Sequence, residues 1–135
     1  MRFDWRLYRH DIRGSLAHAR AQREAGLLTP AEFDAIEAGL RAIEADIEAG
    51  RFEWQASLED VHMNIEAELT KRIGPAGAKL HAARSRNDQV ATDTRLYCRE
   101  AIAEVAGFVR ALQRALVGTA AAHADVVMPG YTHLQ

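Results

Sequence analysis

The chain contains a single cysteine, Cys98, among its 135 residues. One thiol excludes an internal disulfide framework and is typical of a protein in a reducing compartment. No apolar run approaches the roughly 20 residues that a membrane-spanning helix needs, and residues 1–6 are too polar for a secretory signal peptide. We therefore expect a cytoplasmic protein that does not contact a membrane.

The chain also lacks a strong excess of either charge, with 17 Lys and Arg against 19 Asp and Glu and a net charge of −2. This balance gives no reason to expect a nucleic-acid partner. Metal-ligand spacings are missing as well, because there is no His-x-x-x-His and no pair of cysteines. Basic residues cluster locally between Lys71 and Arg86, so we expect any binding site there to prefer anions.

Only three prolines interrupt a sequence that is 48% apolar, and alanine is abundant. This composition predicts an all-α fold. Apolar residues at helical spacing predict a first helix over about residues 4–25, although Gly14 indicates either a break or close packing. The second helix is the clearest, because Thr29-Pro30-Ala31-Glu32 reads as a capping box and Gly50 ends the apolar seam.

Ser57 is expected to cap a third helix, with Asp60 at its third position and Gly74-Pro75 as its end. Residues 74–86 are then one long irregular connection, and such connections are often functional. A final helix from Asn87 or Asp88 to about Ala122 would span roughly 50 Å. Because it is apolar on more than one side, we expect it to need other subunits or further sequence.

The run Ala83-Arg84-Ser85-Arg86-Asn87-Asp88-Gln89 is the most informative stretch. It places two guanidiniums, a hydroxyl and an amide at the start of a helix, where backbone N–H groups attract carboxylates. The alternative is that Asn87 and Asp88 only cap the helix while both arginines are solvated. Spacing alone favours this second alternative, and it also excludes a phosphate-binding P-loop.

Four further residues are weaker candidates when taken one at a time. Asp60 and His62 stand two apart at a helix start and do not form one site with each other; His62 faces either a cleft or solvent. Ser15 follows Gly14 and carries little signal by itself. His133 could act as an acid or a base near neutral pH, although a lone histidine near a chain end is usually no more than that.

Taken together, these residues resemble those of the argininosuccinate lyase family in the fumarase/aspartase superfamily. The resemblance extends over nearly the whole chain, and its most specific part is the Ser-Arg-Asn-Asp-Gln run followed downstream by Gly-Tyr-Thr-His-Leu-Gln. The matching segments, in order, are Arg6–Tyr8, Asp11-Ile12, Gly14-Ser15, Glu59–His62, Gly77–His81, Arg84–Val90 and Pro129–Gln135.

The resemblance implies reversible elimination of argininosuccinate to arginine and fumarate, without a metal or organic cofactor, in arginine biosynthesis by a homotetramer. A base removes the proton β to a carboxylate, and the guanidinium then leaves with a proton from an acid. By position, His133 corresponds to the catalytic histidine, given as base or as acid. The substrate-binding residues that the resemblance implies are Ser15, Asp60, Arg86, Asn87 and Thr132.

Two departures from the family stand out. The family usually has Thr-Gly before the Arg-Ser-Arg run, where this chain has Ala82-Ala83; if that position needs a positive φ, Ala83 strains the loop. The chain is also short, and it lacks the family's Gly-Ser-Ser-x-Met-Pro-x-Lys-x-Asn loop with the catalytic serine. We therefore expect an N-terminal fragment that is inactive alone and that self-associates through its long helix.

The expected organisation is an N-terminal helical domain over residues 1–86, then the first long helix of a central helical bundle over residues 87–135. Two other functions remain open. One is a different lyase of the superfamily, of the adenylosuccinate type. The Arg-Ser-Arg-Asn-Asp-Gln motif argues against this function. The other is a non-catalytic helical protein, like the family's lens crystallin relatives.

Overall fold

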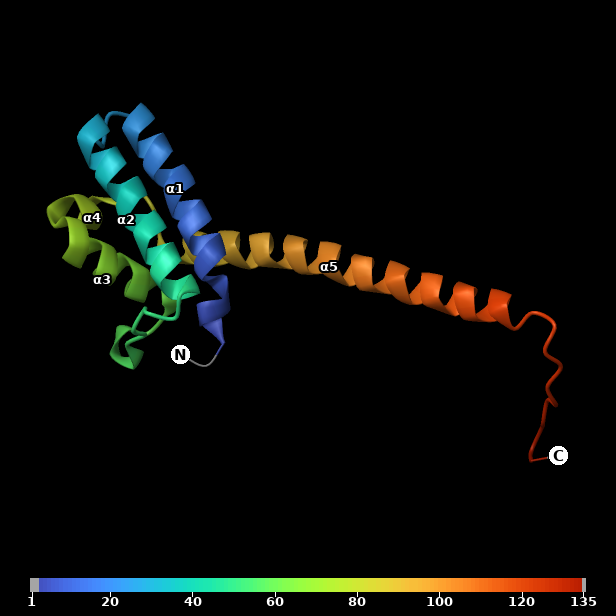
Figure 1. The fold of residues 1–135 in the computed structure, drawn as a ribbon. Coiled ribbons are helices and arrows are strands. Elements are labelled where there is room, and N and C mark those ends of the chain that lie inside the picture. Colours follow the sequence, from blue (N-terminus) through green and yellow to red (C-terminus); the bar gives the residue numbers. More distant parts are fainter. Residues whose placement is uncertain (1–2, 135) are drawn as a thin grey trace. The chain divides into compact units, whose positions relative to one another are not determined.

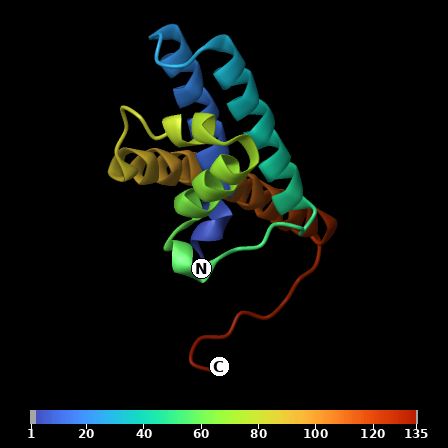
Figure 2. The ribbon, with the colours of Figure 1, turned by 90° about the vertical axis from the view of Figure 1, so that its left-hand side faces the viewer.

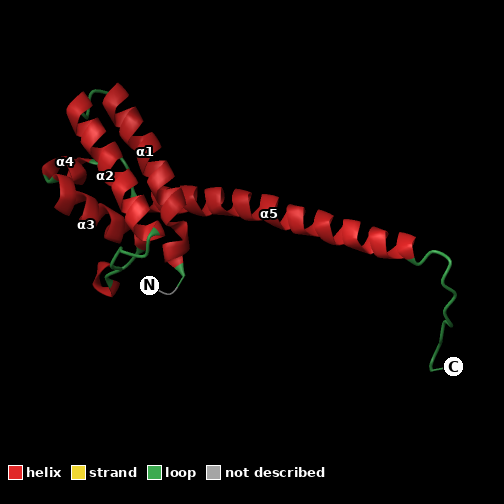
Figure 3. Cartoon of the chain, viewed as in Figure 1, coloured by secondary structure: helices red, strands yellow, loops and turns green. Residues whose placement is uncertain are grey.

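A computed structural model describes residues 3–134 of the chain. In that range it contains helices and connections and no strand (Figure 3), which confirms the predicted all-α class. The chain forms two compact units, Met1–Cys98 and Arg99–Gln135. The predicted domain boundary at residue 86 stays a prediction.

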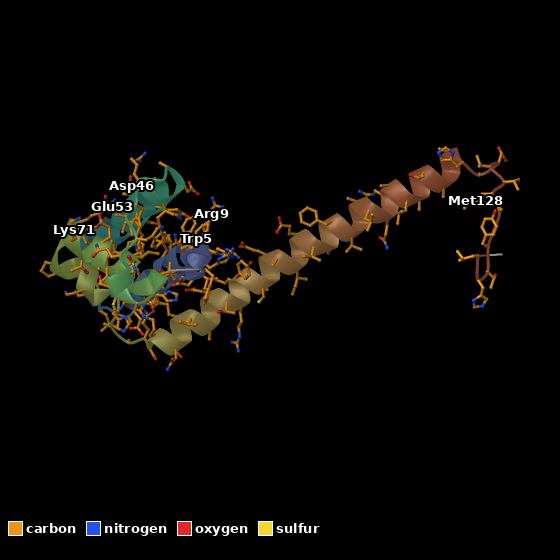
Figure 4. All side chains as sticks on the ribbon, turned by 90° about the horizontal axis from the view of Figure 1, so that it is seen from below. Trp5, Arg9, Asp46, Glu53, Lys71 and Met128 are labelled. Carbon is orange, nitrogen blue, oxygen red and sulfur yellow. The ribbon has the colours of Figure 1, made fainter. Side chains whose placement is uncertain are left out.

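The first unit opens with an antiparallel helix pair (Figures 1 and 2). A short 3-10 helix, η1 (Asp4–Leu7), leads into α1 (Tyr8–Glu24), and α2 (Pro30–Glu48) follows. Helix α1 passes through Gly14 without a break, because the glycine serves close packing instead: a Cβ there would lie 3.3 Å from Asp93 Oδ1. Trp5, labelled in Figure 4, stands in the part of the predicted first helix that precedes α1, and its side chain is 43% exposed.

The start of α2 is as predicted. The Thr29 hydroxyl accepts a hydrogen bond from the Glu32 backbone N–H, and the Glu32 carboxylate accepts one from the Thr29 N–H, so the capping box is complete. Glycines at φ +76 and +68, Gly26 and Gly50, follow the ends of α1 and α2.

The start of the third helix differs from the prediction. Helix α3 (Val61–Ile73) has Asp60, not Ser57, as its N-cap, and the Asp60 carboxylate accepts from Met63 N–H at 2.7 Å. Ser57 lies in a separate 3-10 turn, η2 (Ala56–Leu58). The two elements cannot merge because Glu59 adopts φ +55 between them.

The connection predicted to be irregular contains one more helix, α4 (Pro75–Lys79). Gly74 at φ +70 ends α3, and Pro75 then occupies the first turn of α4, where a missing N–H costs nothing. Gly77 brings α4 directly against α3, since a Cβ on Gly77 would lie 2.8 Å from Thr70 Cα.

These helices enclose one apolar core, formed mainly by α1, α2 and α3. Helices α1, α2 and α3 each bury one stripe of side chains at the predicted helical spacing. The buried residues are Tyr8, Ile12, Leu16, Ala19, Leu28, Phe33, Ile36, Leu40, Ile43, Val61, Ile65, Leu69 and Leu80.

Helix α5 (Arg86–Ala122) begins in the first unit, where Gln89 and Asp93 are its buried residues. In the second unit its apolar side chains stay largely exposed, at 57–68% for Ile102, Val105, Phe108, Leu112 and Leu116. Met128 in the segment after α5 is 79% exposed (Figure 4). None of the described helices is long and apolar enough to cross a membrane.

Candidate functional site

The sequence run Arg84–Gln89 meets helix α3 at Glu66. The Glu66 carboxylate accepts hydrogen bonds from Arg84 Nη2 at 2.9 Å and from Arg86 Nη2 at 2.9 Å, and His81 Nδ1 lies 3.1 Å away. Burial raises the pKa of Glu66, but the bonds from Arg86 and His81 outweigh burial and hold it below its ordinary value. Glu66 is therefore ionised at neutral pH and gathers both guanidiniums.

Arg86 links this carboxylate to the start of α3. Its Nη1 also donates to Gln89 Oε1 at 2.5 Å, and its Nε lies 3.6 Å from Asp60 Oδ2. Two of the predicted binding residues, Asp60 and Arg86, thus lie together where α3 and α5 begin. Asp60 also has a structural role there, because its carboxylate caps the N-terminus of α3.

Arg84 is not the solvated arginine of the alternative interpretation. Its side chain is 8% exposed, and its Nη1 donates to the Ser15 hydroxyl at 3.1 Å. Ser15 is itself 1% exposed, so in this structure it holds the Arg84 guanidinium from the buried side. Its predicted contact with substrate stays a prediction.

The first turn of α5 is capped by Ser85, and not by Asn87 or Asp88 as predicted. Asn87 N–H donates to Ser85 Oγ at 3.2 Å, and Ser85 N–H donates to Asp88 Oδ2 at 3.3 Å. Asn87 is exposed, so its amide is accessible beside Arg86. Just before this turn Ala83 adopts φ +59, the positive φ considered for that position.

Behind these residues lies a buried polar cluster, Asp11–His62–Asp93. His62 Nδ1 lies 3.0 Å from Asp11 Oδ1 and 3.4 Å from Asp93 Oδ2, and the Gln89 amide also donates to Asp11 Oδ1. His62 is 2% exposed, so neither predicted position for it, cleft or surface, is correct. The sequence did not single out Asp11 or Asp93.

The pKa values of two members of the cluster, His62 and Asp93, are shifted. Burial lowers the pKa of His62, but the hydrogen bond and charge of Asp11 more than compensate and leave it raised. Burial together with the charge of Asp11 raises the pKa of Asp93 to about 7.

The donor atoms of the cluster all lie within 4.8 Å of one another, which is compatible with a small cation. The short N–O distances and the Gln89 amide are those of a hydrogen-bonded network, however, and we assign the cluster as such. A cavity of about 130 Å³ adjoins it. Its lining residues are Gly14, His18, Arg84, Asp88, Gln89, Thr92 and Asp93.

The remaining predicted residues, Thr132 and His133, belong to the second unit. Both are exposed, in the segment that follows α5, and His133 adopts φ +53. Gln135, the last residue of their motif, lies outside the described residues. The catalytic role of His133 and the binding role of Thr132 stay predictions.

Comparison with known proteins identifies the family of the chain. A family model described as "Lyase" matches residues 1–135. The chain therefore belongs to this lyase family. Among its relatives are argininosuccinate lyases from Ectopseudomonas mendocina, 60% identical, Azotobacter vinelandii, 59% identical, and Methylococcus capsulatus, 62% identical. Each match covers 98% of this chain and 29% of the relative, so the chain spans less than a third of the length of these proteins.

Proposed function

We propose that the chain is the N-terminal part of an argininosuccinate lyase, an enzyme that reversibly eliminates arginine from argininosuccinate to leave fumarate. The observation that carries the proposal is 59–62% identity over 98% of the chain to lyases of that name. Arg86 and Asn87 support it, because their neighbouring guanidinium and amide donors suit a carboxylate of the substrate.

In the proposed reaction a base removes a proton from the carbon that is bonded to one carboxylate and lies β to the leaving nitrogen, and negative charge accumulates on that carboxylate in an aci form. The C–N bond then breaks to form the double bond of fumarate, and the guanidinium leaves with a proton from an acid. The guanidinium of Arg86 and the amide of Asn87 would donate hydrogen bonds to this carboxylate, and those bonds would become stronger as the charge grows. Glu66 holds the Arg86 guanidinium in place through two hydrogen bonds, so little reorganisation is needed when substrate binds.

His133 would move the proton, as base or as acid, and Thr132 and Ser15 would contact substrate. We assign residues 1–86 to an N-terminal helical domain and 87–135 to the start of a central helical bundle. We place the protein in the cytoplasm, in arginine biosynthesis, as a homotetramer. The exposed apolar side chains of α5 support assembly, since they require a cover.

The test is a hybrid enzyme, because this chain spans only 29% of its relatives. Residues 1–135 replace the matching part of the Methylococcus capsulatus enzyme, and fumarate release is followed by ultraviolet absorbance. We expect turnover of argininosuccinate and none of adenylosuccinate. Asn87→Ala in the hybrid should lower kcat by about 100-fold or more while leaving assembly unchanged.

A hybrid that assembles but turns over only adenylosuccinate, or neither substrate, would contradict the proposal. The isolated 135-residue chain provides a second comparison. We expect it to release no more fumarate than its own His133→Ala variant, because the relatives are more than three times as long.

A further inference from the structure

The carboxyl groups of Asp11, on α1, and Asp93, on α5, meet inside the first unit. Each residue is 1% exposed, and a carboxylate oxygen of each lies within 4.8 Å of the other and of a ring nitrogen of His62. Two ionised carboxylates can only accept hydrogen bonds. So close together in a buried site, two ionised carboxylates also repel each other, which favours a proton on one of them.

The surroundings compensate the pair only in part. His62 of α3 contacts both carboxyls, and the buried Oδ2 atoms of Asp11 and Asp93 accept no hydrogen bond. The charge of Arg84 favours ionisation of Asp93, but its guanidinium is also paired with Glu66. A second ionised carboxylate here would lose its hydration without full replacement, which favours the protonated form.

Among the described residues that line the cavity beside Asp93, each possible cation has another partner. On α1, His18 lines the adjoining cavity, but its Nε2 lies 2.9 Å from Ala82 O. On α5 itself the cavity is lined by a further acid, Asp88. Further along α5, the ring of Tyr97 packs edge-on against that of His10 from α1.

We propose that Asp11 and Asp93 share one proton in the folded chain. This proton stabilises the contact between α1 and the start of α5, beside Arg86. Gln89 provides the connection, since its amide N–H donates to Asp11 while its carbonyl accepts from Arg86. Loss of the proton leaves two buried charges side by side and loosens the turn that carries Arg86 and Asn87.

The pH window follows from the direction of the shift. The pKa of Asp93 is raised from 3.8 to about 7 in the folded chain. Between these values the folded chain binds a proton that the unfolded chain does not. The stability that this proton contributes is complete at pH 4 and is lost as pH rises through about 7. The pKa of His62 is also raised above its ordinary value. Its protonated form therefore stabilises the folded chain as well, and that stability is also lost as pH rises.

The direct test uses the chain itself, labelled with ¹³C at the aspartate carboxyls and titrated by NMR from pH 5 to 9. We expect one of the two buried carboxyls to titrate near pH 7 and the Asn87 backbone amide to shift with the same midpoint. If both carboxyls are already ionised at pH 5, the shared proton is excluded. If Asn87 does not follow, the coupling to the Arg86 site is excluded.

Thermal melting of variants gives an independent readout. Asp93→Asn keeps the shape, supplies an amide donor in place of the protonated carboxyl, and removes the second charge. It should melt above the wild type at pH 8, by about 5 °C, and should flatten the pH dependence. The matched control, Asp34→Asn, changes an exposed aspartate on α2 and should do neither.

Melting with added Zn²⁺ or Mn²⁺ separates a proton site from a metal site. We expect neither ion to raise the melting temperature of the wild type by more than it raises that of Asp93→Asn. A rise confined to the wild type would overturn the proposal in favour of a cation bound by the cluster. Destabilisation by Asp93→Asn at pH 8 would also overturn it, because both carboxylates would then be ionised around a charged His62.

Discussion

Ala83 is an alanine in a left-handed conformation, at φ +59, just before the paired arginines. Such a conformation costs an L-residue roughly 1–2 kcal/mol, and glycine avoids most of that cost. We expect Ala83→Gly to raise the free energy of unfolding by about 1 kcal/mol, measured by urea denaturation.

The neighbouring Ala82 provides the control, because it is also exposed and has no positive φ. Ala82→Gly should lower stability slightly, since glycine adds entropy to the unfolded chain. Equal effects from both substitutions would show that the strain at Ala83 is negligible.

The residues of the site differ in how far the sequence could reveal them. Arg86, Asn87 and Asp60 stand in dense polar motifs, and the sequence indicated all three. Glu66 and Asp93 stand alone on helices, and their partners lie far away along the chain. A single sequence carries no signal for such pairings, although an acid beside buried apolar positions, like Asp11 before Ile12, is a hint.

At the scale of elements, α3 and α4 meet through a glycine. A Cβ on Gly77 would lie 2.8 Å from Thr70 Cα and 2.9 Å from Thr70 N. Because these are backbone atoms, the contact is relieved only if one helix moves. We expect Gly77→Ala to destabilise the first unit by about 1–3 kcal/mol, measured by urea denaturation with far-ultraviolet circular dichroism.

Ala78→Ser is the matched control for Gly77→Ala, since Ala78 is the exposed neighbour on the same helix and its substitution should cost less than about 0.5 kcal/mol. A Gly77→Ala chain as stable as wild type would mean that α4 is free to shift.

The elements themselves were largely predictable, because caps and apolar spacing are local. Helix α2 follows its capping box to the residue. The errors lie where backbone conformation departs from what the side chains suggest. Glu59 at φ +55 separates η2 from α3, and α4 is too short to show a periodic pattern. Neither feature is encoded in the spacing of apolar residues.

At the scale of the whole molecule, the second unit leaves an apolar surface without a cover. Phe108 is 63% exposed and Leu112 is 60% exposed, one turn apart on α5. Water contact with such a stripe is unfavourable, so we expect the chain to self-associate through it. Sedimentation velocity should show a concentration-dependent oligomer, and Phe108→Glu should weaken association by about tenfold or more.

The control for this stripe is Ala103→Glu, which introduces the same charge at an exposed position of α5. Residues 103 and 108 are five apart, about 140° around a helix with 3.6 residues per turn, so Ala103 lies away from Phe108. Association unchanged by Ala103→Glu but weakened by Phe108→Glu would locate the interface on the apolar stripe. A wild-type chain that sediments as a monomer at every concentration would instead mean that this surface requires a partner other than a second copy.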